Sequence, residues 1–405
     1  MNPLLSRLKP YPFERLRQLL AGVSTNPAYP PISLGIGEPR HPTPAFITHA
    51  LTAAAGSVPS GLAAYPATAG DPALRSAFTG WLKRRYALDL NPTTQVLPIN
   101  GSREALFAIA LTIVDPRPED SGADAPLVIC PNPFYQIYEG AALLSGAQPW
   151  FVAADAARNF AQDWDSVPLE VWRRTQLLFV CSPGNPTGAV MPLAGWGKLF
   201  DLSERFNFVI ASDECYSEIY FRDQAPLGGL EAAAKLGRSD FKNLLAFTSL
   251  SKRSNVPGMR SGFVAGDAQL IKNFLLYRTY HGSAMSPIVQ AASIRAWADE
   301  EHVVANRAMY REKFARVTPM LAGVMDVALP DAGFYLWARV GGSDTEFARE
   351  LFALYNVTVL PGSYLAREVH GMNPGAQRIR MALVAETTEC EEAARRIVQF
   401  VKSRT

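Results

Sequence analysis

Short apolar runs alternate with amphipathic stretches along most of this 405-residue chain. Between residues 95 and 265 the runs are four or five residues long, and helical spacing of apolar residues separates most of them. Runs of this kind indicate strands buried on both faces, and their alternation with helices is typical of a mostly parallel sheet flanked by helices, an α/β fold. The predicted strands span residues 95–99, 127–130, 148–152, 177–181, 208–211, 244–248 and 262–265.

The pattern changes after residue 285. A long helical region over residues 287–324 leads into a mixture of short strands and helices, which we interpret as a smaller α+β domain. The elements predicted in this domain are strands at 357–360 and 378–383 and helices at 345–355 and 386–402.

The first residues lack a sheet of their own. Helical spacing over residues 13–20 is followed by a short strand over 32–37 that enters a glycine turn. Because an isolated strand needs a partner, we expect this segment to complete the smaller domain. The predicted division is an N-terminal segment (1–45) that joins the small domain, a large cofactor-binding domain (46–284) and the small C-terminal domain (285–405).

Composition and charge exclude several classes of protein. The 39 basic and 37 acidic residues give a net charge of +2 without a basic block, so nucleic-acid or membrane binding gains no support. The four cysteines lie far apart, without the spacing of metal ligands or of a disulfide framework. Free thiols suit a reducing cytosol and the N-terminus does not resemble a signal peptide, so we expect a cytoplasmic protein without a bound metal.

One lysine stands in a context that suggests covalent chemistry. Lys252 ends the sequence SLSK (249–252), and Arg260 follows eight residues later. A lysine amine with a lowered pKa forms a Schiff base with an aldehyde, and serine hydroxyls and an arginine suit a phosphate. An aldehyde with a phosphate describes pyridoxal 5'-phosphate (PLP). By itself the motif is weak, because a solvated surface lysine fits it as well.

Further polar residues follow the predicted strands at their carboxyl ends, where ligands bind in open α/β sheets. These residues are Ser102, Tyr135, Asn185, Asp213 and Tyr216. A carboxylate such as Asp213 can keep a pyridine nitrogen protonated, and an aromatic ring such as Tyr135 can stack on it. Backbone N–H groups at the helix start near Ser102 can bind phosphate. Each residue alone also fits a helix cap, a turn or core packing, but their order along successive strands favours one site.

Taken together, these motifs resemble the class I/II aminotransferases, PLP-dependent enzymes of fold type I. The motifs are SLSKRSNVPGMRSG (249–262), DECY (213–216) and SPGNPTG (182–188), within a resemblance that extends from LGIGEP (34–39) to RIRMALV (378–384). Other segments resemble more narrowly the N-succinyldiaminopimelate aminotransferases, a bacterial family of lysine and cell-wall precursor synthesis. These segments are GEPRHPTP (37–44), PNPFYQIYEGAA (131–142), YRTYHG (277–282) and PGSYLARE (361–368).

The resemblance implies a role for each motif residue. Lys252 would carry the cofactor and act as the general base, and Asp213 would hold the proton on the pyridine nitrogen. Tyr216 and Asn185 would contact the 3-oxygen of the ring, on which Tyr135 would stack. The residues implied for the phosphate are Ser102, the amide of Arg103, Ser249 and Arg260.

The resemblance also implies substrate contacts and a partner subunit. Arg380 is the expected partner of the substrate α-carboxylate, with Arg378 as the alternative because both have the same strand parity. Gly37 matches a glycine whose backbone lies near that carboxylate, and Asn185 would also contact the substrate. Tyr65 matches a family tyrosine that reaches the phosphate of the other subunit, which implies a homodimer with shared active sites.

The implied reaction takes an amino group from N-succinyl-L,L-2,6-diaminopimelate and gives it to 2-oxoglutarate, which leaves as glutamate. Arg40 replaces an acidic residue common in broader relatives, so we expect it, with Tyr280, near the distal carboxylates of this long substrate. The alternatives are a broad aspartate or aromatic aminotransferase and a C–S lyase of the same fold. A PLP-responsive transcription regulator is disfavoured because no helix-turn-helix motif precedes LGIGEP.

Overall fold

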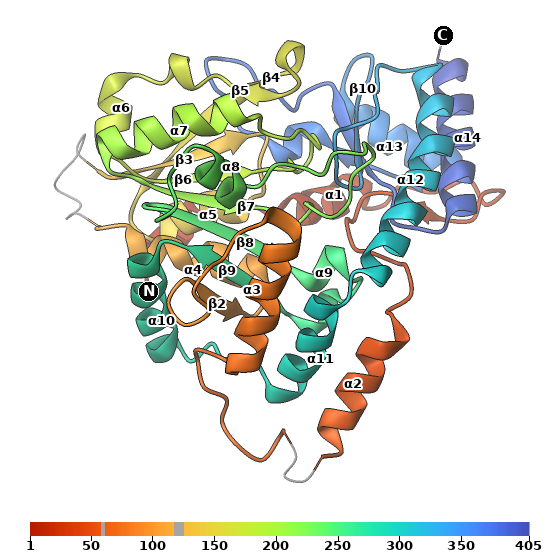
Figure 1. Ribbon diagram of the computed structural model, residues 1–405. Coiled ribbons are helices and arrows are strands. Elements are labelled where there is room, and N and C mark those ends of the chain that lie inside the picture. Colours follow the sequence, from red (N-terminus) through yellow and green to blue (C-terminus); the bar gives the residue numbers. More distant parts are fainter. Residues whose placement is uncertain (58–60, 117–124, 405) are drawn as a thin grey trace.

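The computed structural model describes residues 1–57, 61–116 and 125–404 (Figure 1). Its largest sheet consists, in the described residues, of β2 (Val96–Ile99), β3 (Leu127–Asn132), β4 (Gln148–Asp155), β5 (Ala161–Gln162), β6 (Thr175–Cys181), β7 (Val209–Asp213), β8 (Leu244–Ser249) and β9 (Gly262–Gly266). The strand order is β2-β9-β8-β7-β6-β3-β4-β5. Strands β8, β7, β6, β3 and β4 are mutually parallel, whereas β9 is antiparallel to both its neighbours and β5 is antiparallel to β4. The predicted α/β fold with a mostly parallel sheet is confirmed.

Helices cover both faces of this large sheet. One face carries α3 (Pro72–Tyr86), α6 (Leu169–Arg174), α7 (Leu193–Phe206), α8 (Gly229–Lys235) and α11 (Pro287–Ala298), with α2 (Ala45–Ala55) packed on the outside of α11. The other face carries α4 (Ser102–Ile113), α5 (Ile137–Leu144) and α10 (Ala268–His281). Strand β3 shows why the apolar runs are continuous. Leu127 and Ile129 join the apolar cluster on the face covered by α3 and α7, and Val128 and Cys130 join the cluster on the face covered by α4 and α5. Because successive side chains point to opposite faces, a strand covered on both sides needs an apolar residue at every position.

A second, antiparallel sheet lies beside the large one. Its strands have the order β10-β13-β12, and three helices pack around it (Figure 1). These elements are β10 (Tyr335–Arg339), β12 (Leu360–Pro361), β13 (Arg378–Ala382), α12 (Glu301–Ala322), α13 (Asp344–Tyr355) and α14 (Thr387–Ser403).

The N-terminal segment packs against this small sheet. Helix α1 (Pro12–Leu20) contacts α13 and β12, and β1 (Ile32–Ser33) pairs in parallel with β11 (Val357–Thr358). Leu34 extends the contact, because its N–H donates to the Thr358 carbonyl (2.8 Å) and its carbonyl accepts from the N–H of Ala382 (2.7 Å). The division of the chain at residues 45 and 285 stays a prediction, and α11, beyond residue 285, packs on α2 and α3 rather than on the small sheet.

Three predicted elements differ in detail. The single strand predicted at 357–360 is wrong, because β11 pairs with β1 while β12 pairs with β13 in the small sheet. The helical region over 287–324 is two helices, since Asp299 is extended (φ −104°, ψ 134°) between α11 and α12. The predicted strand over 32–37 is limited to Ile32–Ser33. Within the described ranges, no helix combines the length and apolar character needed to cross a bilayer.

Candidate active site

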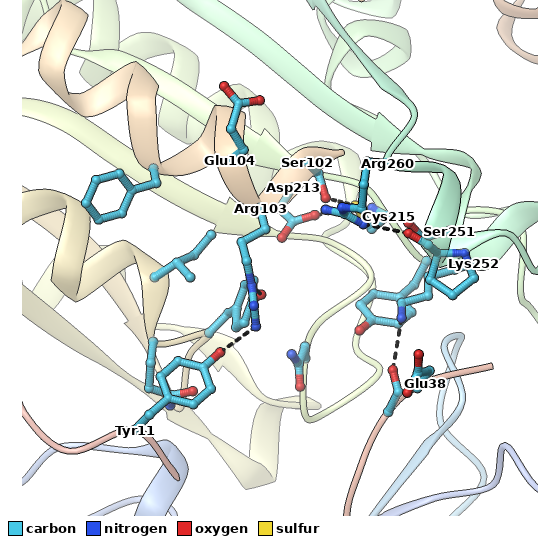
Figure 2. Close-up of a pocket in the computed structure, with 18 of the residues that line it drawn as sticks. Tyr11, Glu38, Ser102, Arg103, Glu104, Asp213, Cys215, Ser251, Lys252 and Arg260 are labelled. Carbon is cyan, nitrogen blue, oxygen red and sulfur yellow. Dashed lines mark hydrogen bonds between the residues drawn. The ribbon is translucent and has the colours of Figure 1, made fainter. Parts of the chain in front are cut away.

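A cavity of about 900 Å³ lies where the large sheet, the small sheet and the N-terminal segment meet. It opens at the carboxyl ends of the large-sheet strands, as expected for a doubly covered α/β sheet. Its walls include ten of the residues predicted from the sequence: Gly37, Ser102, Arg103, Tyr135, Asn185, Asp213, Tyr216, Lys252, Arg260 and Arg380. Figure 2 shows Lys252, Ser251, Cys215 and Arg260 gathered at one end, with Tyr11 and Arg103 at the other.

Lys252 lies on the short helix α9 (Leu250–Arg253), which directly follows β8. Its Nζ donates to the carbonyl of Gly37 (2.9 Å) and lies 5.3 Å from the centre of the Phe334 ring. Burial lowers the pKa of this amine to about 8, and the positive charges of Arg380 and Arg260 act in the same direction. About a tenth of the amine is therefore unprotonated at pH 7, far more than for an ordinary lysine, and the free amine is the form that a nucleophile requires.

Asp213, the last residue of β7, lies at the floor of the cavity. Its Oδ2 accepts from the Tyr138 hydroxyl (2.7 Å) and its Oδ1 accepts from the N–H of Cys215 (3.3 Å). Burial raises the pKa of the carboxyl group, although both hydrogen bonds oppose the shift. The charge of Lys252 also favours the carboxylate form, and a cationic group of a molecule bound in the cavity would be further stabilised beside it.

One end of the cavity has the donors that an anion needs. The N-terminus of α4 opens onto it, with the Ser102 hydroxyl accepting from the Cys215 thiol (2.9 Å), and the guanidinium of Arg260 lies opposite. Gly101 makes this approach possible, because it has φ +82° and a Cβ atom there would overlap the guanidinium of Arg260. The close approach of a helix start and an arginine suits a phosphate.

Arg380 forms the opposite, small-sheet wall of the site. Its Nη1 donates to Asn185 Oδ1 (3.1 Å) and its Nη2 donates to the Gly35 carbonyl (2.9 Å). The guanidinium stacks 4.3 Å from the Tyr335 ring centre, and its buried Nε has no hydrogen-bond partner in the described residues. Arg378 does not line the cavity and instead lies over the Phe160 ring. Of the two arginines, only Arg380 can therefore reach a molecule bound beside Lys252 in this structure.

Two tyrosines and a glycine complete this side of the site. The Tyr216 hydroxyl lies 3.1 Å from the Tyr335 hydroxyl, and burial raises the pKa of Tyr216 well above its usual value. A Cβ atom on Gly37 would overlap the Tyr335 hydroxyl, so the main chain at Gly37 can approach the cavity only without a side chain.

Four predicted site residues do not line this cavity. Ser249 lies directly behind it, where its hydroxyl donates to Ser251 Oγ (2.8 Å) and accepts from the Ser251 N–H. Arg40 forms an ion pair with Glu389 at 3.2 Å. Tyr65 is fully exposed and Tyr280 is 88% exposed. The roles predicted for these four residues stay predictions.

The structure adds wall residues that the sequence did not single out. Ser251 lines the cavity, whereas Ser249 does not. Its position directly before the lysine in the SLSK motif could have predicted this from the sequence. Tyr11 comes from the N-terminal segment, and its hydroxyl accepts from Arg103 Nη2 (2.9 Å). The same guanidinium donates through Nε to the Tyr135 hydroxyl. No local pattern links Tyr11 to this site, because only the folded chain brings the two together.

Comparison with known proteins agrees with this geometry. The family model for aminotransferase class I and II matches residues 29–397. The chain belongs to the class I/II aminotransferases. The cofactor of this family is PLP, and the cavity fits it, with an enclosed amine, a buried carboxylate and an anion-binding end.

This chain is similar over almost its whole length to one curated relative and two solved structures. It is 32% identical to the LL-diaminopimelate aminotransferase of Nitratidesulfovibrio vulgaris (strain DP4), over 98% of each chain. It is 55% identical to an aminotransferase from Neisseria meningitidis Z2491, whose crystal structure matches with a TM-score of 0.94 over 99% of this chain and 100% of that one. A probable N-succinyldiaminopimelate aminotransferase from Thermus thermophilus is 25% identical, with a TM-score of 0.82 over 96% of this chain and 99% of that one.

Proposed function

We propose that this aminotransferase takes the amino group of N-succinyl-L,L-2,6-diaminopimelate and transfers it to 2-oxoglutarate. The observation that carries the proposal is one cavity that holds the Lys252 amine, the Asp213 carboxylate and the Arg380 guanidinium. The segments GEPRHPTP and PGSYLARE support the succinylated donor, and so does the name of the Thermus thermophilus neighbour. The names of the curated relatives favour a second candidate donor, free LL-diaminopimelate.

We assign the cofactor contacts by the chemistry of each wall. The phosphate would lie between the start of α4 and Arg260, the ring nitrogen at Asp213 and the ring 3-oxygen at Tyr216 and Asn185. When bound, PLP supplies an aldehyde that captures amino groups and a ring that accepts the electron pair released at the substrate α-carbon.

The side chains of the protein position the substrate and move its proton. Arg380 would bind the α-carboxylate from the cavity wall, and the reacting carbon would thereby lie beside Lys252. The Lys252 amine, largely enclosed and partly unprotonated near neutral pH, would take the proton from the α-carbon and return it to the carbon on the other side of the transferred nitrogen. The negative charge of Asp213 would favour a proton on the ring nitrogen of the cofactor.

The donor is tested by a half-reaction on the purified protein. N-succinyl-L,L-diaminopimelate, LL-diaminopimelate, aspartate and an aromatic amino acid are each added without an oxo acid, and loss of the cofactor's visible absorbance band is followed. We expect the fastest loss with the succinylated donor, with Lys252→Ala as the inactive control. Faster loss with LL-diaminopimelate would favour the second candidate, and loss only with aspartate or aromatic donors would reject both.

Arg380→Ala is expected to lower kcat/KM for the amino donor by about 10²–10³-fold, because truncating one partner of a buried charge pair costs about 3–4 kcal/mol. Arg378→Ala is the matched control, since it removes an arginine two residues away that does not line the cavity, and it should change kcat/KM by less than about threefold. Steady-state kinetics check both variants. Equal losses in the two would contradict the assignment of Arg380.

We also propose a homodimer in which Tyr65 reaches the active site of the other subunit. The support is the family match at Tyr65 and the full exposure of its side chain, which would otherwise leave a large aromatic ring in water. Sedimentation equilibrium measures the mass directly. A mass of one 44.2 kDa chain at micromolar concentration would reject the dimer.

A further inference from the structure

A buried polar chain lies behind Lys252, on the side away from the cavity. Asn306 of α12 donates through Nδ2 to the main-chain carbonyls of Lys252 (3.1 Å) and Arg253 (3.4 Å). Its Oδ1 lies 3.0 Å from His41 Nδ1 and accepts from Asn255 Nδ2 (2.9 Å). Asn306, His41 and Asn255 are all at least 90% buried. One side chain therefore connects the main chain of the reactive lysine to a histidine 211 residues before it in the sequence.

The direction of these hydrogen bonds follows from which groups can donate. Carbonyl oxygens only accept, so the atom of Asn306 that faces Lys252 and Arg253 is its amide nitrogen. The atom that faces His41 is then the amide oxygen, and His41 must carry its proton on Nδ1. Its Nε2 thereby presents a lone pair to Lys313 Nζ, 2.9 Å away, and accepts from it.

Lys313 makes this arrangement costly. Its side chain is 1% exposed, and His41 Nε2 is the only hydrogen-bond partner of its amine in the described part of the chain. Burial lowers the pKa of both Lys313 and His41, and the Lys313 charge further disfavours a cationic His41. Glu386 partly offsets the charge on both groups. A buried amine held against a neutral ring is unfavourable for folding, which suggests that the arrangement serves the site.

The same loop meets Lys252 a second time. Gly37 accepts from Lys252 Nζ (2.9 Å), and His41 lies only four residues farther along the loop. The loop is thus fixed to the side chain of Lys252 at one point and, through Asn306, to its main chain at another. The Tyr310 ring packs against His41 at a tilt of 45°, with 4.6 Å between ring centres, and closes the far side. Movement of His41 would displace both the lysine backbone and the carbonyl that holds its amine.

We propose that Asn306, held in place by His41 and Lys313, is the positioning residue of Lys252. It fixes the main chain of the lysine and the loop that supplies the Gly37 carbonyl, and it thereby keeps the amine enclosed and reactive. The inference rests on the proposed role of Lys252 as the amine that captures PLP. It does not depend on which amino acid is the donor.

The test is the rate at which cofactor-free protein captures added PLP, followed by absorbance between pH 6 and pH 10. Only the free amine reacts, so the wild-type rate should rise with pH around the Lys252 pKa of about 8. Asn306→Ala lets the loop open and water reach the amine, so the midpoint should move upward by about one pH unit. Capture near neutral pH should then slow by about tenfold.

Three further variants separate positioning from general stability. His41→Phe keeps an aromatic ring but removes the donor to Asn306, and it should shift the midpoint like Asn306→Ala. His41→Asn restores an N–H donor and should recover at least part of the shift. Thr318→Val removes another buried polar group of α12, one without a hydrogen-bond partner in the described residues, and should leave midpoint and rate unchanged.

Three results would overturn the proposal in distinguishable ways. A wild-type midpoint in Asn306→Ala and His41→Phe, together with a lower melting temperature, would assign these residues to stability alone. If Asn306→Ala does not fold, equal midpoints in His41→Phe and wild type would reject the proposal. Covalent capture of PLP by Lys252→Ala at the wild-type rate would instead reject the role of Lys252, on which the proposal rests.

Discussion

Lys252→Ala is expected to lower kcat for transamination by about 10⁴-fold or more, because it removes both the nucleophile and the general base. The wall around it should remain in place. Ser102, Arg260 and Arg380 are held by contacts that do not include the lysine amine, so the variant should still bind PLP and substrate without covalent attachment. Single-turnover absorbance measurements with the best donor give the rate.

Two controls sharpen this prediction. Lys252→Arg keeps a positive charge of similar size but offers no free amine at neutral pH, so it should be as inactive as the alanine variant. A small primary amine such as ethylamine should restore part of the activity of Lys252→Ala, because the truncation leaves space beside Gly37, and should restore none in Lys252→Arg. Activity of Lys252→Ala within tenfold of wild type would show that another group moves the proton.

Asp213→Asn is expected to lower kcat by about 10²–10³-fold, the usual cost of removing a preorganised charge from an active site. The amide has nearly the shape of the carboxylate and can still accept from Tyr138, but it cannot stabilise a positive charge on a ring nitrogen. The pH titration of the bound cofactor's absorbance should also change, because the ring then loses its proton at lower pH. Steady-state kinetics and this titration measure the two effects.

Tyr138→Phe provides the comparison for Asp213. It removes one hydrogen bond to the carboxylate (2.7 Å) but leaves its charge, so kcat should fall by no more than about tenfold. Losses of the same size in Tyr138→Phe and Asp213→Asn would indicate that the orientation of the carboxylate matters more than its charge.

The part of the site that the large sheet carries was predictable from local sequence. Asp213 ends β7, and Ser102 and Lys252 follow β2 and β8 directly, so each is placed by the strand before it. An apolar run fixes the strand, and parallel strands bring their carboxyl ends to one edge. The order of the strands was not needed for this prediction. The carboxyl ends of parallel strands lie at one edge of the sheet, whatever the sequence separation of the strands.

The part of the site that the small sheet and the N-terminal segment carry was not predictable in the same way. Arg378 and Arg380 have the same parity, and only the packing of β13 against Gly35 and Asn185 separates them. The sequence predicted Arg40 near the distal carboxylates of the substrate, whereas in the structure its charge is paired with Glu389, 349 residues away. Tyr335 lines the cavity because β10 packs its ring against Gly37 and Arg380, which lie far from it in the sequence. Each depends on contacts between distant segments, which no local pattern encodes.

The contact between the two ends of the chain has a consequence for synthesis on the ribosome. Arg380 donates to Gly35, 345 residues earlier, and Ile32 and Leu34 are buried in the core of the small sheet. At about 5–20 residues per second, the first segment leaves the ribosome roughly 20–70 s before its partner strand exists. During that interval these apolar side chains have no native cover, and Arg380, the proposed partner of the substrate carboxylate, has yet to be made. The active site is therefore among the last parts of the nascent chain to form.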